Sequence, residues 1–353
     1  NMNVNTLKAV YFIGAGGIGM SALVRYFLSK GKKVGGYDRT PSELTEKLIK
    51  EGAAIHYEEN VSLIPTDFLN PETTLIVYTP AIPAEHKELV YFREHGFEIQ
   101  KRAQVLGMLT RTEKGLCVAG THGKTTTSTA YLLDHSHVGC NAFLGGISKN
   151  YGTNLLLSEK SEYVVIEADE FDRSFHWLTP YATVITATDS DHLDIYGTHE
   201  AYVESFRKYT SLIRPEGFLI MKKGIDLVPD VQPGVTVYTY STKEGDFHAE
   251  NIRIGNGEIF FDFISPLGNI KDIQLGVPVY VNIENGIAAM ALAQIGGATP
   301  EEIKQAMPGF KGVDRRFDFK LKNDHIAFMS DYAHHPAEIK QSISSVRMLY
   351  PDK

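Results

Sequence analysis

Two glycine-rich turns constrain most strongly how this chain can fold. Residues 12–23 read FIGAGGIGMSAL and residues 118–128 read VAGTHGKTTTS. Each turn follows a short apolar run and precedes a helix-like stretch, so its backbone N–H groups and helix N-terminus can face a phosphate group. Because a strand-turn-helix order builds parallel sheets, the two turns predict an α/β chain with two separate phosphate-binding loops.

The order of the remaining segments suggests where the domains lie. Strand-like and helix-like segments alternate up to about residue 102, which predicts a doubly wound domain over residues 1–102. Residues 103–313 repeat the pattern and add antiparallel strands around an Asn256-Gly257 turn. The remaining residues, 314–353, are few for a separate domain, since chains below about 40 residues rarely fold alone. We therefore expect the start of a third domain, cut short.

Composition excludes several classes of protein. The 353 residues carry a formal net charge of −8, and no Lys/Arg run suggests a nucleic-acid partner. No apolar run approaches the length of about 18 residues that a membrane span needs. The two cysteines, Cys117 and Cys140, form no CxxC pair, so we expect buried thiols in a reducing cytosol. We expect that the opening NMNVN is not a signal peptide and that the protein is cytoplasmic.

The second turn carries the more specific chemistry. Lys124 stands where a point charge meets the β- and γ-phosphates, and Thr125 where a hydroxyl can ligate Mg²⁺. The usual phosphate-loop pattern, G-x-x-x-x-G-K-[ST], is not matched fully, because Val118 stands where its first glycine belongs and the glycine is Gly120. The alternative to a phosphate loop is an ordinary helix N-terminus that happens to contain Gly-Lys. We expect ATP contacts from Gly120, Thr121, His122, Gly123, Lys124, Thr125 and Thr126.

Acidic and histidine residues follow two apolar strands of the same unit. In VVIEADE, Glu167 directly follows an apolar strand, and VITATDSDH places Asp189, Asp191 and His192 after the next strand. For each of them alone, a solvated strand end or a loop histidine is the better explanation. Two such strand ends in one α/β unit with a phosphate loop instead favour metal-assisted phosphoryl transfer.

Six motifs in a fixed order resemble the Mur ligase family. They are GTHGKTT, EADEFD, DSDHLD, NIEN, RRFD and DYAHHP, and GAGGIGMSAL precedes them. The resemblance implies an N-terminal Rossmann-like UDP-binding domain, a central P-loop ATPase domain with added antiparallel strands, and a C-terminal Rossmann-like domain. The motifs are most similar to members that join L-alanine to the carboxylate of UDP-N-acetylmuramate through an acyl phosphate, in peptidoglycan precursor synthesis. ATP, two Mg²⁺ sites and a monomer or weak homodimer are implied.

The resemblance also implies roles for single residues. Lys124, Glu167 and His192 would be catalytic; Glu167 and His192 would hold a second Mg²⁺, although that ion prefers oxygen ligands to imidazole. The amides of Asn282 and Asn285 would recognise the adenine edge, with helix capping as the alternative. In the third domain, Arg316 (or Arg315) would contact ATP phosphates and Asp331 the ribose, while Tyr332, His334 and His335 would border the amino-acid site.

The first turn matches G-x-G-x-x-G through Gly14, Gly16 and Gly19, with Asp38 at the end of the next strand. This pattern alone is weak evidence for NAD, because a UDP-sugar also offers a diphosphate and a ribose. The resemblance assigns the turn to UDP-N-acetylmuramate. The implied contacts are Gly14, Ala15, Gly16, Gly17, Ile18, Gly19, Met20, Ser21, Asp38, Thr79, Ala81 and, on the sugar side, Asn154.

Two other functions stay open at this point. An NAD-dependent oxidoreductase would use the first turn but leave GTHGKTT unexplained. A ligase that attaches a peptide to UDP-N-acetylmuramate in wall recycling is a closer alternative. Ala187 also departs from the family, which commonly has Asn there, and the sequence leaves the choice among L-alanine, glycine and L-serine undecided.

Overall fold

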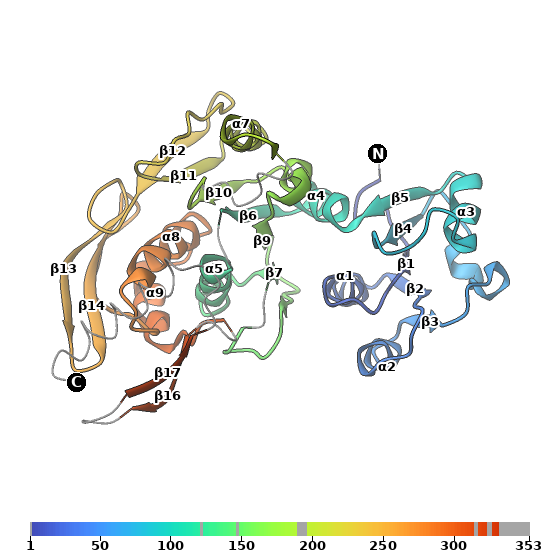
Figure 1. Cartoon of the computed structure of the whole chain (residues 1–353), viewed down its shortest axis with the longest axis horizontal. Helices are drawn as coiled ribbons and strands as arrows, with labels where there is room; N and C mark the ends of the chain where they lie inside the picture. The colour runs from blue at the N-terminus through green and yellow to red at the C-terminus, as the bar shows by residue number, and fades with distance from the viewer. Residues whose placement is uncertain are drawn as a thin grey trace. The chain divides into compact units, whose positions relative to one another are not determined.

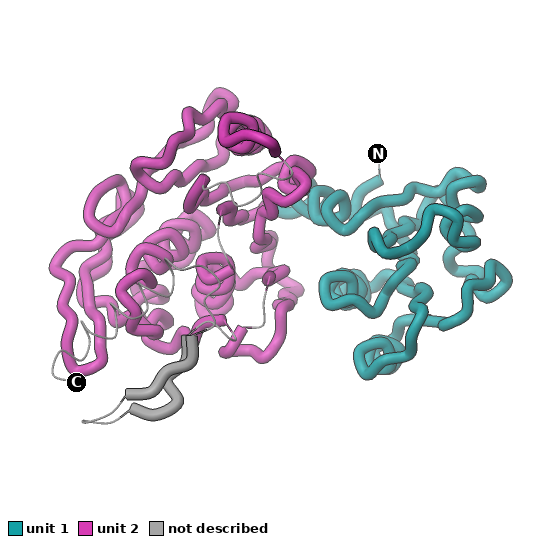
Figure 2. Tube along the Cα trace, in the orientation of Figure 1, with its two compact units in different colours: residues 1–113 teal, residues 114–353 magenta. Residues whose placement is uncertain are grey.

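The computed structural model describes residues 2–120, 123–145, 148–188 and 196–313, together with the backbone of 317–322 and 327–331. The chain divides into two compact units, Asn1–Glu113 and Lys114–Lys353 (Figure 2). The boundary predicted after residue 102 lies at the start of helix α4 (Arg102–Thr112), which belongs to the first unit.

The first unit contains one five-stranded sheet, in the order β3-β2-β1-β4-β5 (Figure 1). Every pair of neighbouring strands is parallel, so the carboxyl ends of all five strands meet at one edge. The strand order reverses between β1 and β4, and ligands of doubly wound sheets bind at such a reversal. The elements are β1 (Ala9–Ile13), α1 (Ile18–Ser29), β2 (Lys33–Tyr37), α2 (Glu43–Lys50), β3 (Ala54–His56), two 3₁₀ turns (Val61–Leu63 and Thr66–Phe68), β4 (Thr74–Tyr78), α3 (Lys87–Glu94), β5 (Glu98–Lys101) and α4.

Local sequence explains where these helices begin and end. Ser42 caps α2: its Oγ accepts a hydrogen bond from the Thr45 N–H at 3.1 Å, while the Thr45 Oγ1 accepts one from the Ser42 N–H at 2.9 Å. Gly31 and Gly52 follow α1 and α2 with φ of +76° and +118°, a conformation that glycine adopts without a steric penalty. These ends depend on neighbouring residues only.

The second unit is built on a seven-stranded sheet in the order β12-β11-β10-β6-β9-β7-β8. All its pairs are parallel except β7 with β8, which confirms the predicted α/β class. The elements are β6 (Lys114–Ala119), α5 (Lys124–Asp134), β7 (Asn141–Phe143), β8 (Leu155–Leu156), β9 (Tyr163–Ala168), a 3₁₀ segment (Phe171–Trp177), β10 (Ala182–Ile185), α7 (His199–Thr210), β11 (Phe218–Lys222), β12 (Thr236–Tyr240), α8 (Val281–Ile295), α9 (Pro300–Ala306) and a 3₁₀ turn (Met307–Gly309).

An antiparallel sheet is inserted before α8, as the alternating pattern predicts. It consists of β13 (His248–Gly255), β14 (Glu258–Ile264) and β15 (Ile270–Gln274). The turn between β13 and β14 is Asn256-Gly257, with φ of +53° and +75°, and both residue types tolerate these angles. Two further antiparallel strands, β16 (Phe317–Lys322) and β17 (Ala327–Asp331), lie in the predicted third domain.

Both cysteines are buried, as expected from the sequence. Cys117 lies on β6 and Cys140 just before β7, and neither forms a disulfide. Burial raises the pKa of the Cys117 thiol to about 12, so this thiol is protonated and unreactive near neutral pH. Within the described stretches, no helix is both long and apolar enough to cross a membrane.

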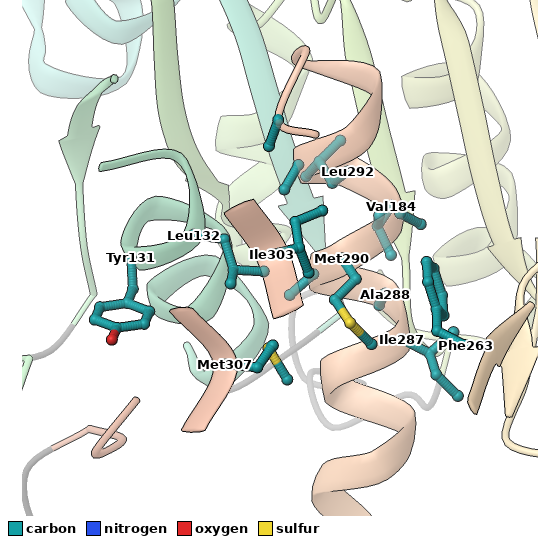
Figure 3. Close-up of a cluster of buried hydrophobic side chains, with 14 of the residues drawn as sticks. Tyr131, Leu132, Val184, Phe263, Ile287, Ala288, Met290, Leu292, Ile303 and Met307 are labelled. Atoms are coloured by element: carbon teal, nitrogen blue, oxygen red, sulfur yellow. The ribbon is translucent and has the colours of Figure 1, made fainter. Parts of the chain in front are cut away.

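The main core of the second unit lies among the seven-stranded sheet, the sheet of β13–β15, and the helices α5, α8 and α9. Figure 3 shows Ile287, Ala288 and Met290 of α8 among side chains from α5, α9 and β14. All three side chains are fully buried. This core fixes α8 against α5, the helix that follows the second glycine-rich turn.

Truncation of a side chain in this core should destabilise the protein strongly. We expect Ile287→Ala to lower the free energy of unfolding by about 2–5 kcal/mol, because the lost contacts leave a cavity. Urea denaturation followed by circular dichroism measures the loss. Lys304→Ala, at an exposed position of α9, is the control and should change stability by no more than about 0.5 kcal/mol. An equal, small effect of both variants would contradict the assignment of this core.

Candidate active site

The second glycine-rich turn connects β6 to α5. Gly120 and Gly123 have φ of +81° and +94°, and Gly123 is the N-cap of α5, which begins at Lys124. A Cβ at Gly120 would lie 2.4 Å from the carbonyl oxygen of Ala187, two residues after the end of β10. The turn therefore packs closely against the neighbouring strand end, and only glycine fits at position 120. Ala187, the departure from the family pattern, borders this turn through its backbone.

Three consecutive threonine hydroxyls follow Lys124 on the first turns of α5. Thr125, Thr126 and Thr127 are buried, and their Oγ1 atoms have no hydrogen-bond partner in the described part of the chain. One turn later, by contrast, the Thr129 hydroxyl donates to the Thr125 carbonyl at 2.8 Å. Buried polar atoms are nearly always paired in folded proteins. Consecutive helical residues point in different directions, so the three hydroxyls do not form one site; Thr125, which directly follows Lys124, is the candidate ligand for a metal ion or phosphate at this turn.

Glu167 lies on β9, directly beside the turn. β6 and β9 pair in parallel, with Val118 opposite Glu167. A Cβ on Gly145 would lie 2.0 Å from the Glu167 Oε2, and one on Gly123 would lie 3.8 Å from its Oε1. The carboxylate therefore occupies space between two glycines, one from the phosphate loop and one from the segment after β7. The structure brings Glu167 to the phosphate loop, as the strand-end argument predicts.

A pocket beside the turn contains the two predicted amide residues. It holds about 470 Å³ of space not filled by atoms, part of which is open to solvent. The walls are mostly apolar, with a few polar groups. Its lining residues are Lys124, Ser128, Leu275, Gly276, Val277, Asn282, Asn285, Gly286, Met307, Phe310, Gly312 and Val313.

The amides in this pocket do not cap their helix. The N-cap of α8 is Tyr280, and no side chain makes a capping hydrogen bond there. The Asn282 Nδ2 donates to the Val277 carbonyl at 3.3 Å, and the Asn285 Nδ2 donates to the Asn282 Oδ1 at 3.2 Å. Both side chains are oriented by these bonds while they line a pocket that also contains Lys124. One site can therefore accept a base at one end and phosphates at the other.

Several predicted site residues lie outside the described residues. For Asp331 only the backbone is described, at the end of β17. Asn154, the predicted sugar-side contact, lies near the segment after β7, where its carbonyl accepts a hydrogen bond from the Leu144 N–H at 2.9 Å. The residues outside the described part are Thr121, His122, Asp189, Asp191, His192, Arg315, Arg316, Tyr332, His334 and His335.

The first glycine-rich turn lies at the strand-order reversal of the first sheet. The N–H groups of Gly14 and Ala15 donate to the Tyr37 carbonyl at 2.8 and 3.1 Å. A Cβ on Gly14 would lie 2.1 Å from the Thr79 Cγ2, and the φ of Gly14 is +98°. The segment Thr79–Ala81 therefore lies beside the turn, as predicted from its strand-end position. Within α1, the Ser21 hydroxyl donates to the Ile18 carbonyl at 2.8 Å.

Asp38 has a structural part in this turn that the sequence did not reveal. Its Oδ2 accepts a hydrogen bond from the Gly16 N–H at 2.7 Å, and its Oδ1 accepts one from the Thr40 N–H at 3.0 Å. The carboxylate thus holds the turn in shape. A contact between Asp38 and a ribose hydroxyl stays a prediction.

Sequence reasoning missed Arg102 as a candidate. Its Nε donates to the Gly19 carbonyl at 3.3 Å, so a guanidinium lies against the first glycine-rich turn. A cation at this position suits a diphosphate. Arg102 directly follows β5, and its place at the carboxyl end of a parallel strand is the signal that could have identified it.

A strained turn after β9 was missed as well. Asp172 and Arg173 both have positive φ, of 49° and 56°. The Arg173 guanidinium lies 4.5 Å from the centre of the Tyr196 ring, while Phe171 remains 49% exposed. Strained backbone of this kind concentrates at functional sites. The motif EADEFD marked the segment, but nothing in the sequence indicates two successive left-handed residues.

Comparisons with known proteins agree with this geometry. Residues 9–114 match the Mur ligase family, catalytic domain, and residues 118–293 match the Mur ligase middle domain. The chain is 78% identical to the UDP-N-acetylmuramate–L-alanine ligase of Phocaeicola vulgatus, over 100% of this chain and 77% of that protein. The solved UDP-N-acetylmuramate-alanine ligase of Thermotoga maritima is 26% identical, with a TM-score of 0.74, and covers 98% of this chain and 79% of that one.

A second solved structure shares the fold. It is the UDP-N-acetylmuramate:L-alanyl-γ-D-glutamyl-meso-diaminopimelate ligase from Neisseria, with a TM-score of 0.71 at 21% identity, over 88% of this chain and 100% of that one. The two domain matches together span most of the chain, and they fall on the two units that hold the two glycine-rich turns. On these grounds the chain belongs to the Mur ligase family.

Proposed function

We propose that this protein is an ATP-dependent ligase that joins L-alanine to the carboxylate of UDP-N-acetylmuramate. The observation that carries the proposal is a single site in which Lys124 belongs both to a phosphate loop and to a pocket lined by two amides. The 78% identity to a protein named for this reaction supports the choice of substrates. The product is a precursor of peptidoglycan.

The chemistry explains why such a site is needed. A carboxylate does not react with an amine unaided, because its oxygen is a poor leaving group. Transfer of the γ-phosphoryl group to the sugar carboxylate gives an acyl phosphate, which the amine of L-alanine attacks, and phosphate leaves. The protein mainly positions the reactants and neutralises charge. Lys124 and the N–H groups at the start of α5 would meet the phosphates, and Asn282 and Asn285 the adenine edge.

The residues present fit Mg²⁺. Thr125 offers an orphaned hydroxyl, and Glu167 offers a carboxylate beside the same turn. Oxygen ligands of this kind are those that Mg²⁺ prefers. When bound, the ion would neutralise developing phosphate charge. No cluster of three or more acidic, histidine or cysteine ligands occurs among the described residues, and His192 lies outside them. Two ions, one held by Thr125 and one by Glu167 with His192, are our proposal.

The first unit would hold the UDP part of the substrate. The Gly14, Ala15 and Gly16 N–H groups are bonded within the protein, so the N-terminus of α1 would face the diphosphate, and Arg102 adds a positive charge. An NAD-dependent oxidoreductase would not use the phosphate loop of the second unit, so that alternative does not explain it. The wall-recycling ligase shares the fold, but the higher identity is to a protein named as an alanine ligase. A cytoplasmic location and a monomer or weak homodimer stay predictions from the sequence.

Phosphate release tests the proposal directly. The 353-residue chain is incubated with ATP, Mg²⁺ and UDP-N-acetylmuramate, together with L-alanine, glycine, L-serine or the recycling tripeptide. We expect release that requires the sugar nucleotide and is fastest with L-alanine. Faster release with the tripeptide would favour the recycling ligase instead. NAD reduction measured at 340 nm, without phosphate release, would contradict the proposal.

Loss of one amide should weaken nucleotide binding specifically. We expect Asn285→Ala to raise the KM for ATP about threefold to tenfold with little change in kcat, which corresponds to one lost hydrogen bond. Steady-state kinetics with ATP as the varied substrate measure the change. Gln305→Ala removes an exposed amide from α9 and should leave the KM unchanged. A drop in kcat at constant KM would place Asn285 elsewhere in the reaction.

A further inference from the structure

One wall of the nucleotide pocket has little regular structure of its own. This pocket wall comprises residues 307–313, of which Met307, Phe310, Gly312 and Val313 line the pocket. Only its first three residues form a 3₁₀ turn. Its shape must therefore come from what packs against it.

Two neighbours approach the pocket wall from the rest of the unit. A Cβ on Gly276 would lie 2.3 Å from the Phe310 carbonyl oxygen, so the segment after β15 touches the wall through backbone. Tyr131 of α5 packs its ring 5.5 Å from that of Phe310. These contacts are steric and restrict how far the wall can move inward.

The third neighbour, the loop of residues 148–151 after β7, provides directional bonds. The Asn150 Oδ1 accepts a hydrogen bond from the Lys311 N–H, and the Asn150 Nδ2 donates to the Gly309 carbonyl, both at 2.8 Å. The Lys149 N–H donates to the Gly312 carbonyl at 3.0 Å, and Ser148 forms an antiparallel bridge with Val313. One side-chain amide therefore satisfies two backbone groups of the pocket wall, which requires a donor and an acceptor together.

The start of the segment after β7 is held independently. β7 pairs in parallel with β9, with Phe143 opposite Ile166, so the sheet fixes the approach to Glu167. Asn150 is not needed to place Gly145 against that carboxylate. Loss of the Asn150 amide should consequently disturb the pocket wall while the surroundings of Glu167 stay in place.

We propose that Asn150 is a positioning residue of the nucleotide site, which holds the pocket wall in the shape that accepts the base of ATP. It acts through residues 309–311 and touches the pocket only indirectly. The inference rests on the proposed function, since it assumes that the pocket between Asn282 and Phe310 receives a nucleotide.

Two variants at position 150 test the inference. Asn150→Ala removes both hydrogen bonds, and we expect the KM for ATP and the Kd of a non-hydrolysable ATP analogue to rise about fivefold to thirtyfold, with kcat within about twofold. Asn150→Asp keeps the acceptor for the Lys311 N–H but sets a second oxygen against the Gly309 carbonyl. It should weaken nucleotide binding at least as much as alanine does.

Gln232→Ala is the matched control. The Gln232 amide also bonds two backbone groups of the same unit, but as a donor to both: it donates to the Ser211 and Ile213 carbonyls at 3.1 and 3.0 Å. It does not line the pocket. Its loss should leave the KM for ATP unchanged. Circular dichroism and a thermal unfolding midpoint equal to those of the wild type show that each variant is folded.

The possible outcomes distinguish a failure of this inference from a failure of the proposed function. Nucleotide binding by Asn150→Ala that equals wild type, or an equal rise in KM for Gln232→Ala, would overturn the inference alone. A fall in kcat without a change in KM would overturn it as well. A wild-type chain that binds UDP-N-acetylmuramate but no ATP analogue would overturn the proposed function and, with it, this inference.

Discussion

Lys124→Met is expected to lower kcat for phosphate release by about 100- to 1,000-fold, the range found when one preorganised group is removed from a developing negative charge. Lys124 begins α5, immediately after Gly123, and also lines the pocket of the two amides. Methionine has a similar length but no charge. The variant should therefore keep the packing of this helix while it loses the interaction with the phosphates.

Kinetics with saturating substrates measure this effect. Lys223→Met is the matched control, because Lys223 is an exposed lysine of the same unit whose ammonium lies 3.3 Å from the Glu244 carboxylate. We expect the control to retain wild-type kcat, since exposed ion pairs contribute little. Binding of UDP-N-acetylmuramate should be the same in both variants. A loss of kcat of less than about fivefold for Lys124→Met would refute the assignment of this turn as the ATP phosphate loop.

Glu167→Gln should lower kcat by a similar factor of about 100–1,000. The change replaces one carboxylate oxygen by an amide nitrogen of nearly equal size, which matters because Gly145 leaves so little space around the Oε2. An amide is a weaker ligand for Mg²⁺ than a carboxylate is. We therefore also expect the variant to require a higher Mg²⁺ concentration for half-maximal activity.

Titration of activity with Mg²⁺ checks both parts of this prediction. Glu162→Gln is a suitable control, because Glu162 directly precedes β9 and pairs with Lys114 at 3.4 Å on the surface. It should retain wild-type kcat and Mg²⁺ dependence. If Glu167→Gln loses activity without any change in Mg²⁺ dependence, Glu167 acts by some means other than holding the ion.

Features set by neighbouring residues could be predicted from the sequence. The Ser42 cap, the Gly31 and Gly52 helix ends and the Asn256-Gly257 turn each depend on a few consecutive residues, and the structure shows all of them. The phosphate loop belongs to this group, since strand, glycine and helix follow one another along the chain. Glu167 was also predicted to lie near the loop, because parallel strands end at one edge of a sheet.

Features that join distant segments could not be predicted. The hydrogen bond from the Gly16 N–H to Asp38 was not expected, because it depends on how the first turn folds back over β2; the ribose contact of Asp38 stays a prediction. Arg102 reaches Gly19 only because β5 and α1 belong to the same folded unit. Asp is enriched among the few non-glycine residues with positive φ, so Asp172 has a weak local signal, but Arg173 has none, and nothing local indicates two such residues in succession.

The sequence by itself determined the strand-turn-helix units and the types of side chain placed at their ends, because hydrophobic periodicity and turn chemistry act over a few residues. Only the tertiary structure decided which of those ends meet. Asn150 and Lys311 are far apart along the chain, and nothing in either stretch specifies the other. They meet because the sheet and the core around α8 bring β7 and the segment after α9 together, and the fit of a whole core is a property that no short stretch contains.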